Sequence, residues 1–239
     1  MKTCKMTTTK WMARLSAVCL LSVLLTSCLK SKNDYYSPPA AYVLFAQASP
    51  DQQPLDLYFN NNRVNSLPLM YGNGLDYFRA FAGIRVVTLN THTGMSKVLS
   101  DSITLKTDSA YSLFLVNKAT NPQLLLLSDS LSKPAAGKAS IRFVNVSPDA
   151  PAVDLAIKDS AAFVSNKGFK SYTRFLPIQG GKSYTFEVRQ HGTSTVLATI
   201  TDVTLNSGLV YTLWFHGLAT TSINDDKLKA ELMTNAYYY

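Results

Sequence analysis

Short apolar runs alternate with turn-forming residues through most of this chain, and the whole pattern occurs twice. Residues 41–59 read AYVLFAQASPDQQPLDLYF, and residues 139–157 read ASIRFVNVSPDAPAVDLAI. In the last five residues of each segment, apolar side chains take every second position, which is the period of a strand with one buried face. Similar runs rich in Val, Ile, Thr, Tyr and Phe recur between Gly, Asn, Asp and Pro, without a helical period. This pattern predicts an all-β chain with about seven short strands per copy, typical of an immunoglobulin-like antiparallel β-sandwich.

The duplication continues beyond these segments and sets the predicted domain boundaries. The run ITL at 103–105 matches VTL at 203–205, and YFR at 77–79 matches YTR at 172–174. Between the copies a short run, LSKPAAG, leaves no room for a folded element. The prediction is therefore sandwich 1, a linker and sandwich 2, at residues 39–130, 131–137 and 138–239.

Two tyrosines occupy matching places late in each copy. Tyr111 and Tyr211 each lie six residues after a strand leucine, Leu105 or Leu205. This spacing resembles the tyrosine corner of immunoglobulin-like sandwiches, in which the hydroxyl bonds a backbone group where the chain crosses between sheets. The alternative is a plain core tyrosine at the start of a strand, and both roles are structural.

Residues 1–27 have the composition of a secretory signal peptide. Basic residues precede the apolar run 15–25, which is too short to cross a bilayer as a helix of about 20 residues. The run ends in Leu25-Thr26-Ser27-Cys28, which resembles the bacterial lipobox. The resemblance implies that Cys28 becomes a lipid-modified N-terminus and that residues 28–38 form a tether. An ordinary signal peptide with an incidental cysteine is the alternative.

Loss of this leader changes the cysteine count and the charge. Cys28 then remains as the last cysteine, so no disulfide or thiolate chemistry is expected. Four of the 23 basic residues leave with the leader, and 19 basic residues then face 15 acidic ones, a mild excess that does not predict nucleic-acid binding. Leu29 in place of an aspartate after Cys28 favours the outer membrane. The tether has two lysines and one acid at 30–34, which leaves the periplasmic and surface sides open.

The Ser-Pro-Asp segment, together with the strand before it, resembles the domain of unknown function 4397 family of exported bacterial proteins. Residues 142–154, RFVNVSPDAPAVD, carry the resemblance most closely. In the first copy Gln52 and Gln53 stand where the second copy has Ala-Pro. The resemblance implies a fold and an exported location, and it brings no activity and no catalytic residues.

Each copy places two aspartates around this turn, Asp51 with Asp56 and Asp149 with Asp154. Asp56 and Asp154 project from the strand face opposite the core leucines. As carboxylate pairs they are candidate ligands for a sugar hydroxyl or Ca²⁺, although calcium prefers six to eight oxygens. The favoured alternative is that Ser, Pro and Asp hold the turn. No metal site and no cofactor are predicted.

The sequence offers little for catalysis. His92, His191 and His216 lack metal-binding spacing and are interpreted as solvated loop histidines. There is no nucleophile elbow, phosphate-binding glycine loop or zinc-protease motif. No catalytic residue is therefore predicted.

An aromatic side chain stands on the outer face of a late strand in each copy. In residues 211–216, YTLWFH, Trp214 lies on the face opposite Tyr211, and Phe114 is its counterpart in the first copy. An exposed Trp214 is a candidate for stacking on a sugar ring, whereas burial between the two domains is the favoured alternative.

Asp-Ser followed by an aliphatic residue occurs four times, in predicted turns or linkers. This resembles the O-glycosylation acceptor motif of exported Bacteroidetes proteins, and ordinary turn composition is the alternative. The implied acceptors are Ser102, Ser109, Ser130 and Ser160.

Together these features predict a lipid-anchored, non-catalytic protein of the cell envelope. The first hypothesis is a binding module for a polysaccharide, another glycan or an envelope protein. The second is a structural spacer that holds a partner off the membrane, and the third is an envelope hydrolase with no assigned residues. The expected partners are thus the membrane, through lipid, and a polysaccharide or envelope protein, but not nucleic acid.

Overall fold

The computed structural model describes residues 38–238, which form sixteen β-strands and one short 3-10 helix, η1 (Asn224–Asp226). Cys28 and the predicted leader and tether, up to residue 37, lie outside this range. Within it no helix has the length and apolar character needed to cross a bilayer. The predicted all-β fold is confirmed.

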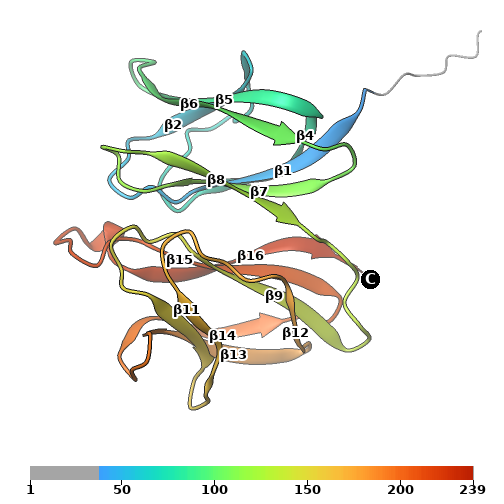
Figure 1. The fold of residues 1–239 in the computed structure, drawn as a ribbon, viewed down its shortest axis with the longest axis vertical. Coiled ribbons are helices and arrows are strands. Elements are labelled where there is room, and N and C mark those ends of the chain that lie inside the picture. Colours follow the sequence, from blue (N-terminus) through green and yellow to red (C-terminus); the bar gives the residue numbers. More distant parts are fainter. Residues whose placement is uncertain (1–37, 239) are drawn as a thin grey trace, which may run out of the picture. The chain divides into compact units, whose positions relative to one another are not determined.

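The first copy folds into two four-stranded sheets (Figure 1), with the strand orders β4-β1-β7-β8 and β3-β2-β5-β6. The bounds are β1 (Ala40–Gln47), β2 (Leu55–Phe59), β3 (Asn62–Arg63), β4 (Gly74–Phe81), β5 (Gly83–Thr91), β6 (Lys97–Leu105), β7 (Ala110–Val116) and β8 (Gln123–Asp129).

The second copy repeats this topology strand for strand, with the orders β12-β9-β15-β16 and β11-β10-β13-β14. The bounds are β9 (Lys138–Asn145), β10 (Val153–Ile157), β11 (Ala162–Lys167), β12 (Leu176–Gln179), β13 (Lys182–Gln190), β14 (Val196–Leu205), β15 (Leu209–His216) and β16 (Lys229–Tyr237).

The sequence analysis predicted antiparallel sandwiches, but each sandwich also contains one parallel pair of strands. β1 pairs in parallel with β7, and β9 pairs in parallel with β15. The Ser-Pro-Asp turn follows the first strand and sends the chain to the opposite sheet, so no hairpin partner follows β1 directly. The first strand can therefore lie beside a strand that comes much later in the sequence.

Each sandwich encloses its own core. Leu57, Val87 and Leu113 are completely buried in the first core, and Leu155, Phe186 and Leu213 are at most 1% exposed in the second. The tyrosine corner is present in both. Tyr111 Oη accepts a hydrogen bond from the Lys106 backbone N–H at 3.1 Å, and Tyr211 Oη accepts one from Asn206 at 3.0 Å.

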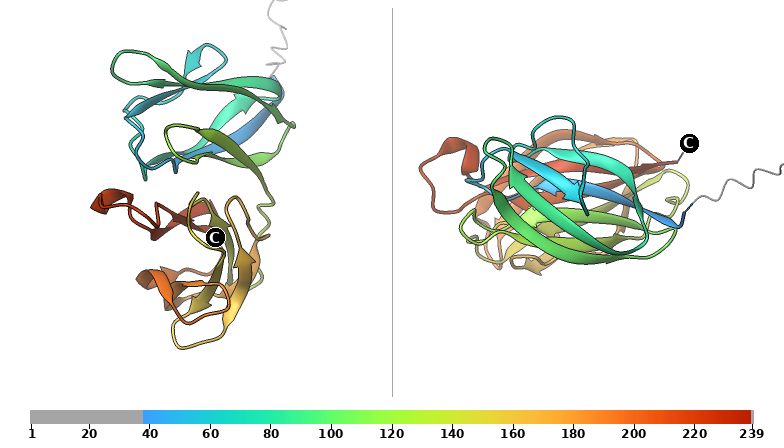
Figure 2. Two further views of the ribbon diagram at one scale, coloured as in Figure 1. Left: turned by 60° about the vertical axis from the view of Figure 1, so that its left-hand side comes forward. Right: turned by 90° about the horizontal axis from the view of Figure 1, so that it is seen from above.

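A third hydrophobic cluster forms from the outer faces of the two sheets that contain the parallel pairs. It joins side chains of β1, β7, β8, β9 and β15 with Ala48 and Val146, which follow β1 and β9. The four sheets are therefore successive layers, with a core between each neighbouring pair (Figures 1 and 2). This cluster holds Ala46, Ala48, Phe114, Val116, Leu127, Val144, Val146 and Trp214.

The strand registers correct one detail of the sequence match. Phe78 pairs with Val43, and Leu176 pairs with Ile141, the equivalent of Val43 beside the corner tyrosine. Counting back one residue makes Phe175 the counterpart of Tyr77, three positions after Tyr172. The match of YFR with YTR was therefore wrong by three residues. The two short sequences are similar, but they occupy different positions in their strands.

Candidate functional site

The first aspartate of each Ser-Pro-Asp turn ties that turn to the loop after the seventh strand of its copy. Asp51 Oδ1 accepts a hydrogen bond from the Ala119 backbone N–H at 2.9 Å. Asp149 Oδ1 accepts one from Ala219 at 2.8 Å, and Asp149 Oδ2 accepts one from the Thr220 hydroxyl at 3.0 Å. These carboxylates therefore act as loop ties in both copies.

Asp56 is buried, with 1% of the residue exposed, and its carboxylate has partners within the protein. Arg63 Nη2 lies 2.7 Å from Oδ1, and Asn65 Nδ2 donates to the same oxygen at 3.1 Å. His92 Nδ1 lies 3.1 and 3.2 Å from the two oxygens. Burial alone would raise the pKa of Asp56, but these hydrogen bonds and the Arg63 charge lower it.

Asp154 occupies the same strand position in the second copy and is surrounded by donors. The Asn166 backbone N–H donates to Oδ1 at 2.7 Å, and the Gly192 N–H donates to Oδ2 at 3.2 Å. His191 Nδ1 and the Ser165 hydroxyl contact Oδ1 at 2.8 and 2.9 Å. Burial opposes ionisation, yet these bonds outweigh it and lower the pKa of Asp154 to about 2.

This geometry does not support the candidate binding roles of Asp56 and Asp154, because both carboxylates are committed to neighbouring loops. Asp154, His191 and Ser165 also fail as a catalytic triad. The Ser165 hydroxyl donates directly to Asp154 and lies 3.4 Å from His191 Nδ1, the nitrogen that already faces the aspartate. A general base would need its other nitrogen on the hydroxyl. Within residues 38–238 no group of three His, Cys, Asp or Glu is arranged for a metal ion.

Trp214 is not available for stacking on a sugar, because the residue is 3% exposed. It lies in the cluster between the sandwiches, with its ring centroid 6.1 Å from that of its counterpart Phe114. Burial of Trp214 between the two domains was the favoured alternative in the sequence analysis. The prediction of a solvated loop histidine is wrong for His216, which is fully buried and stacks on Trp214 with centroids 3.9 Å apart.

His216 also links the two copies. Its Nδ1 lies 2.7 Å from the Tyr71 hydroxyl of the first copy, and its Nε2 lies 3.5 Å from Glu231. Burial disfavours the charged ring and lowers the pKa of His216, although Glu231 opposes the shift. His92 and His191 do lie in loops, with side chains 40% and 42% exposed.

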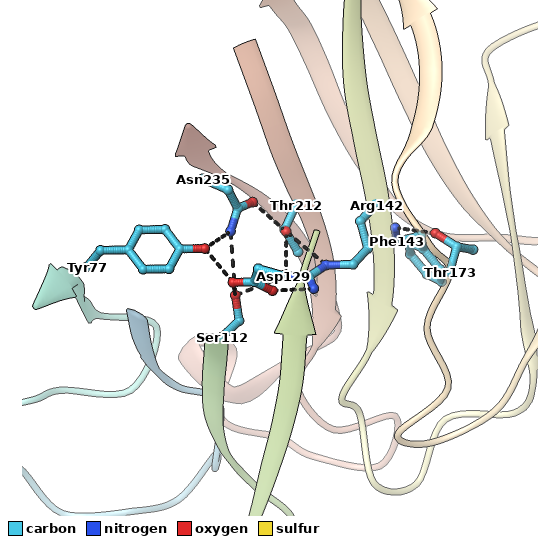
Figure 3. Close-up of polar contacts among 8 residues, drawn as sticks. All are labelled: Tyr77, Ser112, Asp129, Arg142, Phe143, Thr173, Thr212 and Asn235. Carbon is cyan, nitrogen blue, oxygen red and sulfur yellow. Dashed lines mark hydrogen bonds and ion pairs between the residues drawn. The ribbon is translucent and has the colours of Figure 1, made fainter. Parts of the chain in front are cut away.

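A buried polar network crosses the interface beside this cluster (Figure 3). Arg142 Nη1 bonds Asp129 Oδ1 at 2.6 Å, and their side chains are 2% and 0% exposed. The Arg142 guanidinium also donates to the hydroxyls of Ser112 and Thr212, at 3.0 Å from Nη2 to each. Burying an ion pair is costly unless its donors and acceptors are satisfied, as they are here.

Tyr77 of the first copy and Asn235 of the second copy complete the network. The Tyr77 hydroxyl donates to Asp129, and Asn235 Nδ2 donates to the Tyr77 oxygen at 3.0 Å. Burial, followed by the Asp129 charge, raises the pKa of Tyr77. On the other side Arg142 lies over the Phe175 ring, 4.6 Å from its centroid. The sequence analysis missed this network, because its members come from six strands or strand edges far apart in the chain.

The four implied glycosylation acceptors differ in their surroundings. Ser130 and Ser160 are exposed and lie in a strand exit and a bend, and Ser109 is half-buried before β7. Ser102 is exposed but lies within β6, so the prediction that it lies in a turn or linker is wrong. Asp129, the acid before Ser130, is the buried partner of Arg142.

The first sandwich carries a groove of about 440 Å³ at its open edge. β3 and β4 are the edge strands of its two sheets, and the groove extends from β3 to β4 and the start of β5. Phe81 is 53% exposed at its wall. The groove is lined by Phe59, Asn60, Asn62, Arg63, Val64, Phe78, Arg79, Ala80, Phe81 and Arg85.

Three of the residues that line the groove are arginines. Arg63 is held by Asp56 behind it, and Arg85 is held by the chain itself. Arg85 Nε donates to the Phe81 carbonyl at 2.8 Å, and the guanidinium carbon lies 5.9 Å from the centroid of that ring. No carboxylate lines this groove. The sequence did not signal it, because three arginines on separate strands form no local motif.

Residues 41–156 match the model of the domain of unknown function DUF4397. The match begins in β1 and ends in β10, so it includes the first sandwich and both Ser-Pro-Asp turns. The resemblance inferred from the turns is thereby confirmed. No curated protein matches the chain.

Some solved structures align over most of the chain at low similarity. One is a family 26 carbohydrate-binding module from Eubacterium rectale Amy13K in complex with maltoheptaose, 11% identical with a TM-score of 0.26, covering 82% of this chain and 97% of that chain. Another is from family 41 carbohydrate-binding modules of streptococcal virulence factors, 9% identical with a TM-score of 0.23, covering 80% and 96%. Values this low say nothing about a ligand of this chain.

Proposed function

We propose that this protein is a non-catalytic glycan-binding module of the bacterial cell envelope, with its ligand site in the groove of the first sandwich. The groove is the observation that carries the proposal. It combines an exposed aromatic ring, Phe81, with side-chain amides at Asn60 and Asn62 and with arginines. Binding sites for small ligands are typically concave, with apolar walls and a few convergent polar groups. A sugar ring offers an apolar face for Phe81 and hydroxyls for the amides.

The test is retention of the protein on a panel of immobilised glycans, including neutral α- and β-glucans, an acidic polysaccharide and peptidoglycan. Phe81→Ala is expected to reduce retention on the glycan that binds. Tyr172→Ala is the matched control, because Tyr172 is a similarly exposed aromatic residue, 49% exposed, in the second copy. Retention on no glycan, or equal retention of both variants and the parent, would remove the groove from consideration.

A rigid spacer is the second candidate, and the interface between the copies favours it. The linker is short, and the buried Arg142–Asp129 pair and the third hydrophobic cluster fasten the sandwiches together. Such a unit resists bending, as a spacer requires. A spacer would tolerate Phe81→Ala in cells but not deletion of one copy, whereas a binder would lose function with either change.

Both candidates include lipid attachment at Cys28 and an outer-membrane location as part of the proposal. Cys28→Ala is expected to abolish incorporation of radiolabelled palmitate and to release the protein from the membrane fraction. Protease treatment of intact and lysed cells separates the two faces. Cleavage in intact cells indicates the surface, and protection until lysis indicates the periplasm.

A further inference from the structure

We infer that the groove of the first sandwich selects an acidic glycan, one whose sugar units carry carboxylates, as in a polyuronate. This inference rests on the proposed function and names its ligand class. The juxtaposition that carries it is Arg63, Arg79 and Arg85 around one groove beside an exposed aromatic ring.

Charge is the first argument. The ten lining residues include three arginines and no acid. Asp56 pairs with Arg63 from beneath the groove, and its carboxylate is 2% exposed, so it does not meet the ligand. An arginine presents a planar fork of N–H donors that matches a carboxylate with two parallel hydrogen bonds. Three such groups attract an anionic sugar more strongly than a neutral one.

Preorganisation is the second argument. Arg85 donates from Nε to Phe81 O and from Nη2 to Ala82 O. These bonds use two of its five N–H groups, so the side chain is oriented while other donors remain. Arg63 is oriented by Asp56 at 2.7 Å. Because these side chains are already ordered, less conformational entropy is lost when a ligand binds.

The second copy supplies the third argument, because the same fold forms there without these arginines. The registers equate Arg63 with Ala162 and Arg79 with Pro177, since Tyr58 corresponds to Ala156 and Phe78 to Leu176. They also equate Arg85 with Tyr184, two residues after the paired starts of β5 and β13.

Only one of the three has a structural role that the second copy preserves. Tyr184 donates to the Gln179 carbonyl at 2.8 Å and so ties the same chain connection as Arg85. A tyrosine serves the fold there equally well. The presence of three arginines along this one groove in the first copy therefore exceeds what the fold requires.

The test measures binding of the protein to oligogalacturonate and to its methyl-esterified form by calorimetry. The two probes share a sugar backbone and differ in charge. Esterification is expected to weaken binding by roughly tenfold to one hundredfold, as for loss of charge-assisted hydrogen bonds. Arg79→Gln is expected to weaken binding of the acid form by about tenfold and to leave the ester unchanged. Arg174→Gln, an exposed arginine of the second copy, removes the same charge elsewhere and is expected to change binding less than twofold.

The other outcomes separate this inference from the proposed function. Equal binding of the acid and ester forms, lost in Phe81→Ala, would overturn the acidic ligand and retain the glycan site. Binding of no glycan would overturn both. Dextran sulfate serves as a third probe. If Arg79→Gln and Arg174→Gln weaken the binding of both polyanions equally, the attraction is general charge and the inference fails.

Discussion

The two copies keep the same strand order, turns and tyrosine corners, but they differ at the sandwich edge and in the centre of their interface. In the first copy the edge holds Arg63, Arg79 and Arg85, whereas the second has Ala162, Pro177 and Tyr184. What both copies keep serves the fold, and what only one has is a candidate for function. The duplication thus provides an internal control for every proposed site.

The buried aspartates illustrate the shared part. Asp56 and Asp154 take the same place on the second strand of their copies, and each contacts a histidine, His92 or His191. The remaining partners differ, since an arginine and an asparagine side chain serve Asp56 while backbone N–H groups and a serine serve Asp154. Both copies keep the buried aspartate and its contact with a histidine, but the other donors differ. The role of this aspartate is therefore to hold the neighbouring loop in place.

The interface illustrates the other part. The copies meet through equivalent strands. The equivalent hydroxyls of Ser112 and Thr212 therefore both accept hydrogen bonds from Arg142, and Phe114 packs on its counterpart Trp214. This is the arrangement of an isologous dimer within one chain. The symmetry is broken at two pairs of positions. Arg142 corresponds to Leu44 in the strand register. Asp129 accepts a hydrogen bond from Ser112, and Asn235, at the bulge of β16, accepts one from Thr212, so Asn235 takes the place of Asp129. The buried ion pair therefore exists on one side of the pseudo-axis only.

The largest expected effect comes from making one of these positions symmetric. Arg142→Leu places the residue of the first copy in the second and leaves the Asp129 carboxylate buried without its cation. We expect a loss of about 4 kcal/mol in the free energy of unfolding, because an unpaired buried charge is not solvated. Urea denaturation of the variant and the parent at neutral pH measures it.

The matched control is the double variant Arg142→Leu with Asp129→Asn. Both positions then hold the residues of their counterparts, and no charge remains buried. We expect the double variant to recover most of the stability that the single variant loses. A double variant as unstable as the single one would mean that Arg142 acts through packing on Phe175 rather than through its charge.

The next effect concerns the paired aromatic residues. Trp214→Ala leaves a cavity between the sandwiches and removes the ring that stacks on His216. We expect a loss of about 3 to 4 kcal/mol. Trp214→Phe, which reproduces Phe114, should cost much less. A thermal denaturation series measures both, and an unchanged midpoint for Trp214→Ala would contradict burial of this residue in solution.

The features that the sequence predicted are those formed by residues close together in the chain, and the features that it missed are formed by residues far apart. Strand alternation and the Ser-Pro-Asp repeat are local, so the sandwiches and their duplication were predictable. The tyrosine corners were too, because Tyr111 and Tyr211 bond backbone groups only five residues away. Arg142 and Asp129 meet across two sheets, and Asp129 drew notice only as part of an Asp-Ser motif. The groove arginines come from three strands, so only the folded edge brings them together.

A smaller effect is the dependence of stability on pH that Asp154 contributes. Asp154 has a pKa of about 2 in the folded protein and about 3.9 when unfolded, so its stabilisation is complete above about pH 5. It is lost as the pH falls from about 5 through 2, and it amounts to roughly 2 to 3 kcal/mol. We expect Asp154→Asn to lose less stability than the parent between pH 5 and pH 2.5, measured by urea denaturation. Parallel curves for the two proteins would contradict the lowered pKa.

The smallest effect tests the feature that the copies share most closely. Tyr111→Phe and Tyr211→Phe each remove one hydroxyl that accepts a backbone hydrogen bond, from Lys106 or Asn206. We expect a loss of about 1 kcal/mol for each, the usual net value of one such bond. Tyr42→Phe is the control, because Tyr42 is 51% exposed on β1, and it should leave the urea midpoint unchanged. Equal losses in the two corners would show that this tie contributes the same in both copies. A loss in only one would mean that the copies differ in their cores as well as at the groove and the interface.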